Sequence, residues 1–201
     1  MIDVVTVGNS HLFGDVLASQ YRLRYRVFVE REKYDVPSWG DMEFDQFDTP
    51  ASTYLIRRDE QGQARAMARL IPTETPYMIA SLWPYLLEDG KPPRSSKVWE
   101  ATRFACDHEL DAETRALYMG ELISGCLEFA LRNGIERYVC VLKGKQLPRI
   151  LSSAGCDVAP IGPASSVGHF PVVASRVAVT EESLFRVRAL KGVSGDVLNA
   201  P

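Results

Sequence analysis

The stretch KVWEATRFACDHELDAETRALYMGELISGCLEFALRNGIERYVCVL, residues 97–142, predicts a strand, a long helix and a second strand in succession. Residues 112–133 carry apolar side chains at helical spacing, and Gly134 follows as a residue that ends helices. The flanking segments 97–105 and 136–142 are short and apolar. A helix that connects two neighbouring strands makes them parallel. The stretch therefore predicts the parallel core of a larger sheet.

Further elements are predicted on both sides of this unit. Those before it are a strand at 2–7, a helix at 10–33 with Ser10 as N-cap, a loop at 34–51, and strands at 53–58 and 64–71. An irregular segment at 72–96, with a short helix near 82–87, leads into the unit. The elements after the unit are a helix at 146–153, a strand at 171–179, and a helix at 181–190 capped by Thr180. A hairpin followed by a crossover predicts an α/β (α+β) fold with a mixed sheet and helices on both faces.

The composition excludes several classes of protein. The 201 residues, 46% hydrophobic and 24% charged, fit a single domain over 1–201. No apolar run is long enough to span a bilayer, and the N-terminus does not resemble a secretory signal, so we expect a cytoplasmic protein with no membrane partner. A net charge of −3 argues against a nucleic-acid partner. The cysteines and histidines lack metal-ligand spacing, so no metal is expected.

The charges are unevenly distributed. Residues 30–48 hold seven acidic against two basic residues, and residues 132–149 hold five basic against one acidic residue. Two such regions suggest two different ligands or partners. The basic group Lys143, Lys145 and Arg149 suits a phosphate-bearing ligand or an acidic partner, and a plain solvated face is an equal alternative.

Aromatic side chains precede the acidic segment. Arg24 and Phe28 lie one turn apart on the predicted first helix, and Tyr34 and Trp39 follow in the loop. Such a cluster beside acids could hold a cation or an adenine ring. The alternative is that Phe28 belongs to the core and Arg24 is solvated.

The segment EFDQFD, residues 43–48, places three acids within six residues. They could bind a metal, an amine or a sulfonium, although the glycine and ligand spacing of a calcium loop are missing. A solvated acidic turn is the alternative.

Two later segments carry charges inside apolar strands. Arg69 lies in a strand that is apolar on both faces, so it requires a carboxylate partner from the protein or a ligand. Glu100 and Arg103 would point to opposite faces of a regular strand, and a β-bulge would bring them to one side. The alternative is a structural ion pair of Glu100 with Arg69. Two arginines and one acid leave a positive charge that a bound carboxylate would balance.

Four segments together resemble the acyl-homoserine-lactone synthases, the quorum-sensing autoinducer synthases. They are RYRVF at 24–28, EFDQFD at 43–48, ARLIPT at 68–73 and WEATRF at 99–104, and the resemblance covers about residues 1–180. It implies a GNAT-like three-layer α-β-α sandwich with a V-splayed sheet. It also implies an enzyme that joins S-adenosylmethionine to an acyl group carried as a thioester by acyl carrier protein or coenzyme A. Both molecules are substrates, the donor carrying phosphopantetheine, so no cofactor is implied.

The resemblance also implies site residues. Glu100, aided by Asp45 or a water, would deprotonate the amine, and Arg69 or Arg103 would offset the substrate carboxylate. Backbone N–H groups near 100–106 would stabilise the oxyanion. The sequence departs from the family at Tyr34, where tryptophan is usual. The implied S-adenosylmethionine contacts are Arg24, Phe28, Tyr34, Asp45, Asp48, Arg69 and Arg103, and the implied catalytic residues are Glu100, Asp45 and Arg103.

Other residues are expected to bind the acyl donor. An acyl pocket is expected near Met78, Leu122, Cys126 and Leu142. Leu142 lies near a position where members that prefer 3-oxo chains carry threonine, which favours an unsubstituted chain. The segment QLPR at 146–149 resembles members that use coenzyme A thioesters. Lys143, Lys145 and Arg149 would contact the acyl carrier.

Two other functions remain open at this point. An ordinary GNAT-type N-acetyltransferase would carry a Gln/Arg-x-x-Gly-x-Gly/Ala turn for pyrophosphate, and residues 106–120 lack that glycine pair. A non-catalytic ligand-binding domain would hold S-adenosylmethionine without releasing methylthioadenosine.

Overall fold

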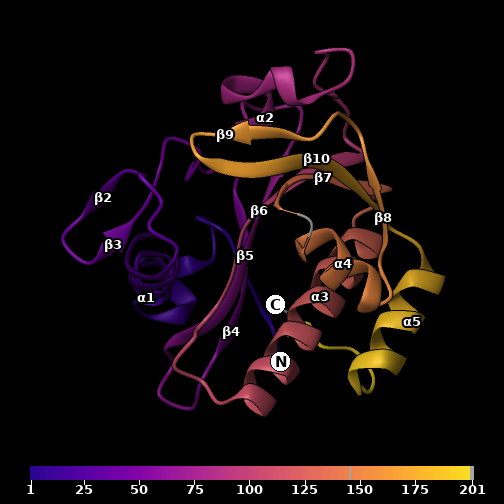
Figure 1. Cartoon of the computed structure of the whole chain (residues 1–201). Coiled ribbons are helices and arrows are strands. Elements are labelled where there is room, and N and C mark those ends of the chain that lie inside the picture. Colours follow the sequence, from indigo (N-terminus) through magenta and orange to yellow (C-terminus); the bar gives the residue numbers. More distant parts are fainter. Residues whose placement is uncertain (145, 200–201) are drawn as a thin grey trace.

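The computed structural model describes residues 1–144 and 146–199 of the chain. An eight-stranded sheet runs through it in the order β1-β4-β5-β6-β7-β10-β8, with β9 paired to β10 (Figure 1). Its strands are β1 (Asp3–Val5), β4 (Thr53–Arg58), β5 (Ala64–Pro72), β6 (Val98–Cys106), β7 (Arg137–Lys143), β8 (Asp157–Pro160), β9 (Ser165–Val167) and β10 (Phe170–Ala178). A separate hairpin is formed by β2 (Ser38–Trp39) and β3 (Met42–Glu43).

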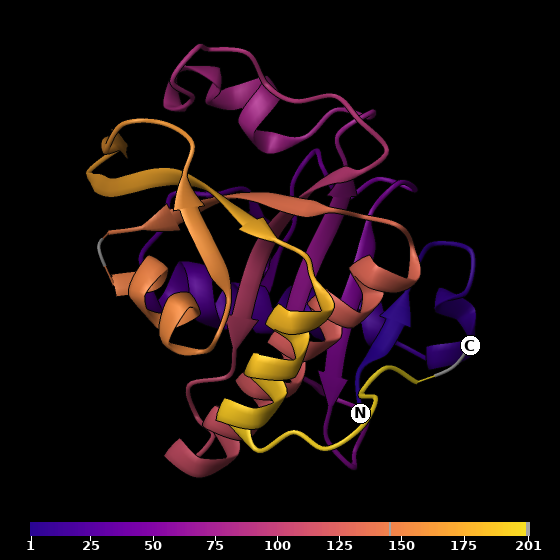
Figure 2. The ribbon, with the colours of Figure 1, turned by 90° about the vertical axis from the view of Figure 1, so that its right-hand side faces the viewer.

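The sheet is mixed and splits at its centre. β6 and β7 are parallel, and the other pairs are antiparallel. The parallel pairing covers only Val98–Glu100 against Arg137–Val139. Beyond it β6 continues along β5 and β7 continues along β10, so the two halves diverge (Figure 2). The predicted V-splayed sheet is confirmed.

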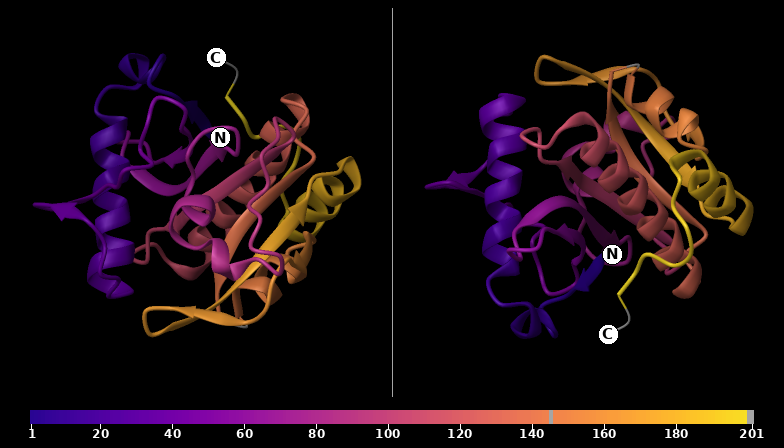
Figure 3. Two further views of the ribbon diagram at one scale, coloured as in Figure 1. Left: turned by 90° about the horizontal axis from the view of Figure 1, so that it is seen from above. Right: turned by 90° about the horizontal axis from the view of Figure 1, so that it is seen from below.

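Helices cover both faces, as the GNAT-like sandwich requires (Figures 1 and 3). α1 (Val16–Arg24) and the π-helix η2 (Tyr25–Arg31) lie on one face. α3 (Ala112–Arg132), α4 (Gln146–Ser153) and α5 (Glu181–Lys191) lie on the other. The short helices α2 (Met78–Leu82) and η3 (Pro84–Leu86) pack over the paired part of β6 and β7, in one core cluster with Val98 and Val139.

α3 follows its sequence pattern closely. Asp111 accepts the backbone N–H of Thr114 as N-cap, and Gly134 takes φ 66° just after the helix. Its stripe Leu122, Cys126, Phe129 and Ala130 is buried against the sheet. Burial of this stripe fixes the crossover that makes β6 and β7 parallel.

The single helix predicted at 10–33 is wrong. A 3-10 turn, η1 (Ser10–Phe13), comes first, and Gly14 at φ 64° breaks the chain direction before α1 begins. Ser10 caps no helix, because its hydroxyl donates to the carbonyl of Val7. The last part of the segment is the π-helix η2, in which a wider turn re-aims the side chains.

Other differences concern short elements. The irregular segment holds its helix at α2, earlier than predicted, and η3 follows. The sequence pattern predicted neither β8 nor β9, which are three or four residues long and half-exposed. No helix of the described residues has both the length and the apolar character needed to cross a membrane.

Candidate active site

Three arginines and three carboxylates form a buried network between α1, β3, β5 and β6. Arg24, Arg69 and Glu43 are fully buried, and the side chains of the other members are at most 11% exposed. The charges balance without a ligand, so the unmatched positive charge expected at Arg69 and Arg103 is absent. The members are Arg24, Arg69 and Arg103 with Glu43, Asp45 and Asp48.

Arg24 fixes the acidic segment to α1. Its Nε lies 2.5 Å from Glu43 Oε2 and its Nη1 lies 2.7 Å from Asp48 Oδ1. Burial alone would raise the pKa of Asp48, but the hydrogen bonds and charge of Arg24 hold it well below its usual range. Tyr54 adds a hydroxyl donor 2.8 Å from the same carboxylate. The acids of this segment are therefore buried partners of arginine, and the alternative of a solvated turn is wrong.

Arg69 has the carboxylate partner that its burial requires. Its Nη1 lies 2.7 Å from Asp45 Oδ1, and its Nε donates to Thr102 Oγ1 at 3.1 Å. Burial would raise the pKa of Asp45, and the hydrogen bonds and charge of Arg69 lower it below its usual value. The alternative pair of Arg69 with Glu100 is wrong.

The β-bulge predicted in β6 is confirmed. Met67 faces Ala105 and Arg69 faces Thr102, so β6 has one extra residue between them. Arg103 takes that position at φ 51°, a left-handed conformation that costs a non-glycine residue roughly 1–2 kcal/mol. Its Nη2 lies 2.8 Å from Glu43 and 2.6 Å from Asp45. The network supports this strained backbone, which brings Arg103 to the same side as Glu100.

Glu100 differs from the other buried acids. Its two oxygens accept the backbone N–H groups of Met78, at 2.9 Å, and Ile79, at 2.8 Å. Burial raises the pKa of Glu100 to about 7, although these hydrogen bonds and the charges of Arg69 and Arg103 act against the rise. Glu100 can therefore exchange a proton near neutral pH, whereas Asp45 and Asp48 stay ionised.

The residues expected to form the acyl pocket are divided. Leu122, Cys126 and Leu142 share one core cluster beneath α3. Met78 belongs to a separate cluster, and its sulfur accepts hydrogen bonds from Arg69 at 3.3 Å and Arg103 at 3.6 Å. Met78, the first residue of α2, therefore lies apart from the other three, beside the charged network and Glu100.

The outer side of the network is aromatic. The Arg103 guanidinium lies 5.6 Å from the centre of the Phe28 ring, and Tyr34 lies parallel to Phe28 at 5.9 Å. Phe170 of β10 packs edge-on against Tyr34 at 4.7 Å. Trp39 does not join this cluster, because it lies on the β2–β3 hairpin and is 76% exposed. No local pattern could have brought Phe170, far along the chain, to this place.

The basic residues have separate surroundings. Lys143 Nζ lies 2.6 Å from Glu32 Oε2. Burial would lower the pKa of Lys143, and the pair with Glu32 raises it above its usual value. Arg149 is exposed on α4, and Lys145 lies outside the described residues. A donor contact by Lys143 would therefore first have to replace Glu32.

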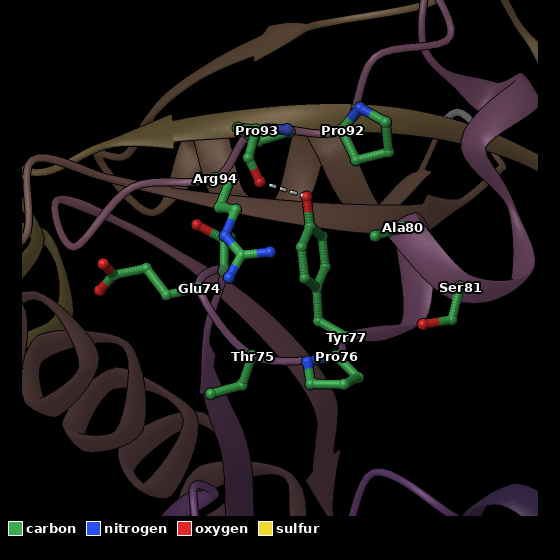
Figure 4. Close-up of a pocket in the computed structure, with 10 residues that line it drawn as sticks. Glu74, Thr75, Pro76, Tyr77, Ala80, Ser81, Pro92, Pro93 and Arg94 are labelled. Atoms are coloured by element: carbon green, nitrogen blue, oxygen red, sulfur yellow. Dashed lines mark hydrogen bonds between the residues drawn. The ribbon is translucent and has the colours of Figure 1, made fainter.

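A surface pocket of about 410 Å³ lies on the outer side of α2 (Figure 4). Tyr77, just before α2, donates its hydroxyl to the carbonyl of Pro93 at 2.6 Å. This bond ties the start of α2 to the 91–95 segment and so fixes the N–H groups that face Glu100. In the part of the chain that the structure describes, no three His, Cys, Asp or Glu side chains are grouped to hold a metal ion.

Comparisons with known proteins identify the family of the chain. A family model described as autoinducer synthase matches residues 11–187. An acyl-homoserine-lactone synthase from Aeromonas salmonicida is 36% identical over 150 residues, which cover 71% of this chain and 69% of the relative.

Solved structures support the same family. MesI, a CoA-dependent acyl-homoserine lactone synthase, is 28% identical with a TM-score of 0.88 over 98% of both chains. BjaI, a CoA-dependent synthase solved with SAM and isopentyl-CoA, is 26% identical with a TM-score of 0.89 over 99% of this chain and 92% of that one. A putative N-acetyltransferase from Lactobacillus plantarum, 16% identical with a TM-score of 0.59 over 89% of this chain and 99% of that one, shares the fold. The chain thus belongs to the autoinducer synthase family, whose members are acyltransferases that make acyl-homoserine lactones.

Proposed function

We propose that this synthase takes its acyl group from a coenzyme A thioester and transfers it to the amine of S-adenosylmethionine. MesI and BjaI, both described as CoA-dependent, match nearly the whole chain. The QLPR segment at 146–149 points the same way. Both substrates are cytoplasmic metabolites, so we propose that location for the protein.

The charge of the site supports S-adenosylmethionine as acceptor. The three arginines and three carboxylates of the network sum to zero, and an ionised Glu100 makes the site −1. S-adenosylmethionine, with a sulfonium, an ammonium and a carboxylate, carries +1. Transfer of one proton from its ammonium to Glu100 leaves both neutral, which favours the reaction in a buried site.

We assign two roles to the residues of the network: one group contacts the acceptor, and the other holds the carboxylates in place. Arg103, 11% exposed, with Phe28 and Tyr34, contacts S-adenosylmethionine from the outer side. Arg24, Arg69 and Asp48 are fully or almost fully buried and hold Glu43 and Asp45 in place. Arg24 and Arg69 thus act on the acceptor through their carboxylate partners.

The first step is acyl transfer. Glu100, directly or through a water, accepts a proton of the acceptor ammonium, and the freed amine attacks the thioester carbonyl. The backbone N–H groups near the Arg103 bulge stabilise the oxyanion. The C–S bond of the thioester then breaks, coenzyme A leaves as the thiol with one proton, and an amide remains.

The second step closes the lactone. The carboxylate oxygen of the acylated acceptor attacks its own γ-carbon, and the bond from that carbon to the sulfonium breaks. Methylthioadenosine leaves as a neutral thioether that takes both bonding electrons. Because the attack is intramolecular, holding the chain folded supplies most of the acceleration.

The acyl chain is proposed to enter between the diverging β6 and β7. Leu122, Cys126 and Leu142 form the apolar side of this space beneath α3. The hydroxyl-free Leu142 favours an unsubstituted chain. Arg149, exposed on α4, is available to the phosphates of the donor.

The test is methylthioadenosine release from purified protein. It is supplied with S-adenosylmethionine and equal concentrations of straight and branched acyl-CoA thioesters and of the same acyl groups on acyl carrier protein. Release with acyl-CoA, together with the lactone mass, supports the proposal. Release only with acyl carrier protein overturns the donor assignment. Acylation without methylthioadenosine indicates an ordinary acyltransferase, and binding of S-adenosylmethionine without turnover indicates a binding domain.

A further inference from the structure

A set of contacts joins the two halves of the sheet at its open end. Glu32 and Tyr34, just after η2, reach Lys143 of β7 and Phe170 of β10. The Glu32–Lys143 distance is 2.6 Å, and the centres of the Tyr34 and Phe170 rings lie 4.7 Å apart. Lys143 Nζ lies 5.0 Å from the Tyr34 ring and 4.4 Å from the Phe170 ring. The ion pair and the aromatic contact therefore form one unit.

The unit lies at the open end of the sheet, where no strand pairing joins β6 to β7. The last β6–β7 pair joins Glu100 to Val139, and Lys143 lies at the far end of β7, beyond this pairing. At the closed end a second ion pair, Lys97 with Glu136, joins the starts of the same two strands, also at 2.6 Å. Within residues 1–144 and 146–199, two lysine–glutamate pairs thus have the same length, one at the paired end and one at the open end.

The backbone of this segment is strained. Lys33, between Glu32 and Tyr34, takes φ 57°, a left-handed conformation that disfavours a lysine. The N–H of Glu32 donates to Val27 O, and the N–H of Tyr34 donates to Phe28 O. Strained turns of this kind persist where neighbouring contacts fix both flanking residues. Here those contacts orient the Glu32 carboxylate and the Tyr34 ring toward β7 and β10.

Contacts continue inward from Tyr34 to the charged network. Tyr34 lies parallel to Phe28, and Phe28 lies beneath the Arg103 guanidinium. Any movement of Tyr34 therefore changes the outer wall of the site. Both Glu32 and Lys143 are about one third exposed, at 32% and 33%, so dissolved ions can reach the pair.

We infer that Glu32 and Lys143 are positioning residues for the acceptor: their ion pair holds Tyr34 against Phe170 and closes the open end of the sheet over bound S-adenosylmethionine. The inference rests on the proposed acceptor site at Tyr34. Breaking the pair frees Tyr34 to move aside, which admits S-adenosylmethionine and releases methylthioadenosine. In this role Lys143 serves the acceptor and not the acyl donor.

The test compares K143M, E32Q, the double variant and K143R with the wild type. We expect K143M and E32Q each to raise the KM for S-adenosylmethionine about three- to tenfold, with kcat changed less than about twofold. The double variant should match the single variants, because both remove one interaction. K143R should keep the wild-type KM. Raised salt should raise the wild-type KM and leave that of K143M nearly unchanged.

The matched control is K97M, which removes the ion pair of the same length, although more exposed, at the closed end. Equal KM changes in K97M and K143M would mean general loosening of the sheet and would overturn the inference. A rise confined to the KM for the thioester would place Lys143 on the donor side and would also overturn it. If the wild type releases no methylthioadenosine with any donor, the proposed function fails, and equilibrium binding of S-adenosylmethionine then tests the inference. Unchanged binding by K143M refutes it, and weakened binding supports it.

Discussion

Replacing Glu100 by glutamine should abolish the neutral-pH dependence of the reaction. With a pKa of about 7, the ionised fraction of Glu100 is about one half at pH 7 and about one tenth at pH 6. A glutamate at its ordinary 4.5 would be almost fully ionised at both. The wild-type kcat/KM should therefore fall about fivefold between pH 7 and pH 6 and approach a tenfold fall per pH unit below pH 6. Loss of the base should lower kcat/KM by about 10²–10⁴, and the remaining activity should lack this slope.

The assay is methylthioadenosine release between pH 5.5 and 8.5 in buffers of constant ionic strength. The acceptor amine also titrates in this range, so the slope that belongs to the protein is the one that E100Q removes. E128Q is the matched control, because Glu128 is also buried and also accepts a backbone N–H, from Val197. It should keep the wild-type slope. An E100Q variant with the wild-type slope and rate would refute the assignment of Glu100 as base.

Three further predictions concern stability and are measured by urea unfolding. Arg24→Ala should lower the free energy of unfolding by about 3–5 kcal/mol, since two buried carboxylates lose their partner, and a loss below about 1 kcal/mol would contradict the network. The pKa of Asp48 is lowered in the folded state, so the ionised carboxylate stabilises the fold above its ordinary pKa of 3.8, and this stabilisation is lost as the pH falls. Asp48→Asn should therefore have a lower free energy of unfolding than the wild type at pH 7. Its free energy of unfolding should fall less on acidification than that of the wild type. Gly162→Ala should cost roughly 1–3 kcal/mol, because its Cβ would lie 1.9 Å from the carbonyl oxygen of Leu86, whereas Gly8→Ala, with 3.7 Å to its nearest neighbour, should cost less.

The sequence predicts best the elements whose pattern is local and long. The apolar stripe of α3 keeps helical spacing from Tyr118 to Ala130 and Gly134 follows, so the end of the helix and its buried face follow from the local pattern. The bulge at Arg103 is also predictable, because a regular strand would separate Glu100 and Arg103. The four family segments contain all six members of the charged network. Glu43 is not among the expected site residues, although it lies in the same segment as Asp45.

The partners of these residues depend on tertiary structure. Arg69 could pair with Glu100 or with Asp45 on sequence alone, and the folding of the acidic segment onto α1 decides for Asp45. The balance of three positive and three negative charges then follows. The raised pKa of Glu100 has another cause, its burial, which also depends on tertiary structure. The break at Gly14 is missed because the apolar stripe continues on both sides of it. Phe170 reaches Tyr34 only because β10 pairs with β7.

The short pairing of β6 with β7, here called the seam, divides the sheet into two parts that carry different steps of the proposed reaction. The charged network and Glu100 all lie between residues 24 and 103, in the part that ends with β6. The backbone pairing of β6 with β7 is only three residue pairs long. Chimeras that exchange the part from α3 to β10 between synthases should therefore transfer the donor preference and keep the charged network and Glu100, and they should affect the acceptor through Lys143 and Phe170. Recombination at this seam is a route by which new signal molecules can arise without rebuilding the charged core.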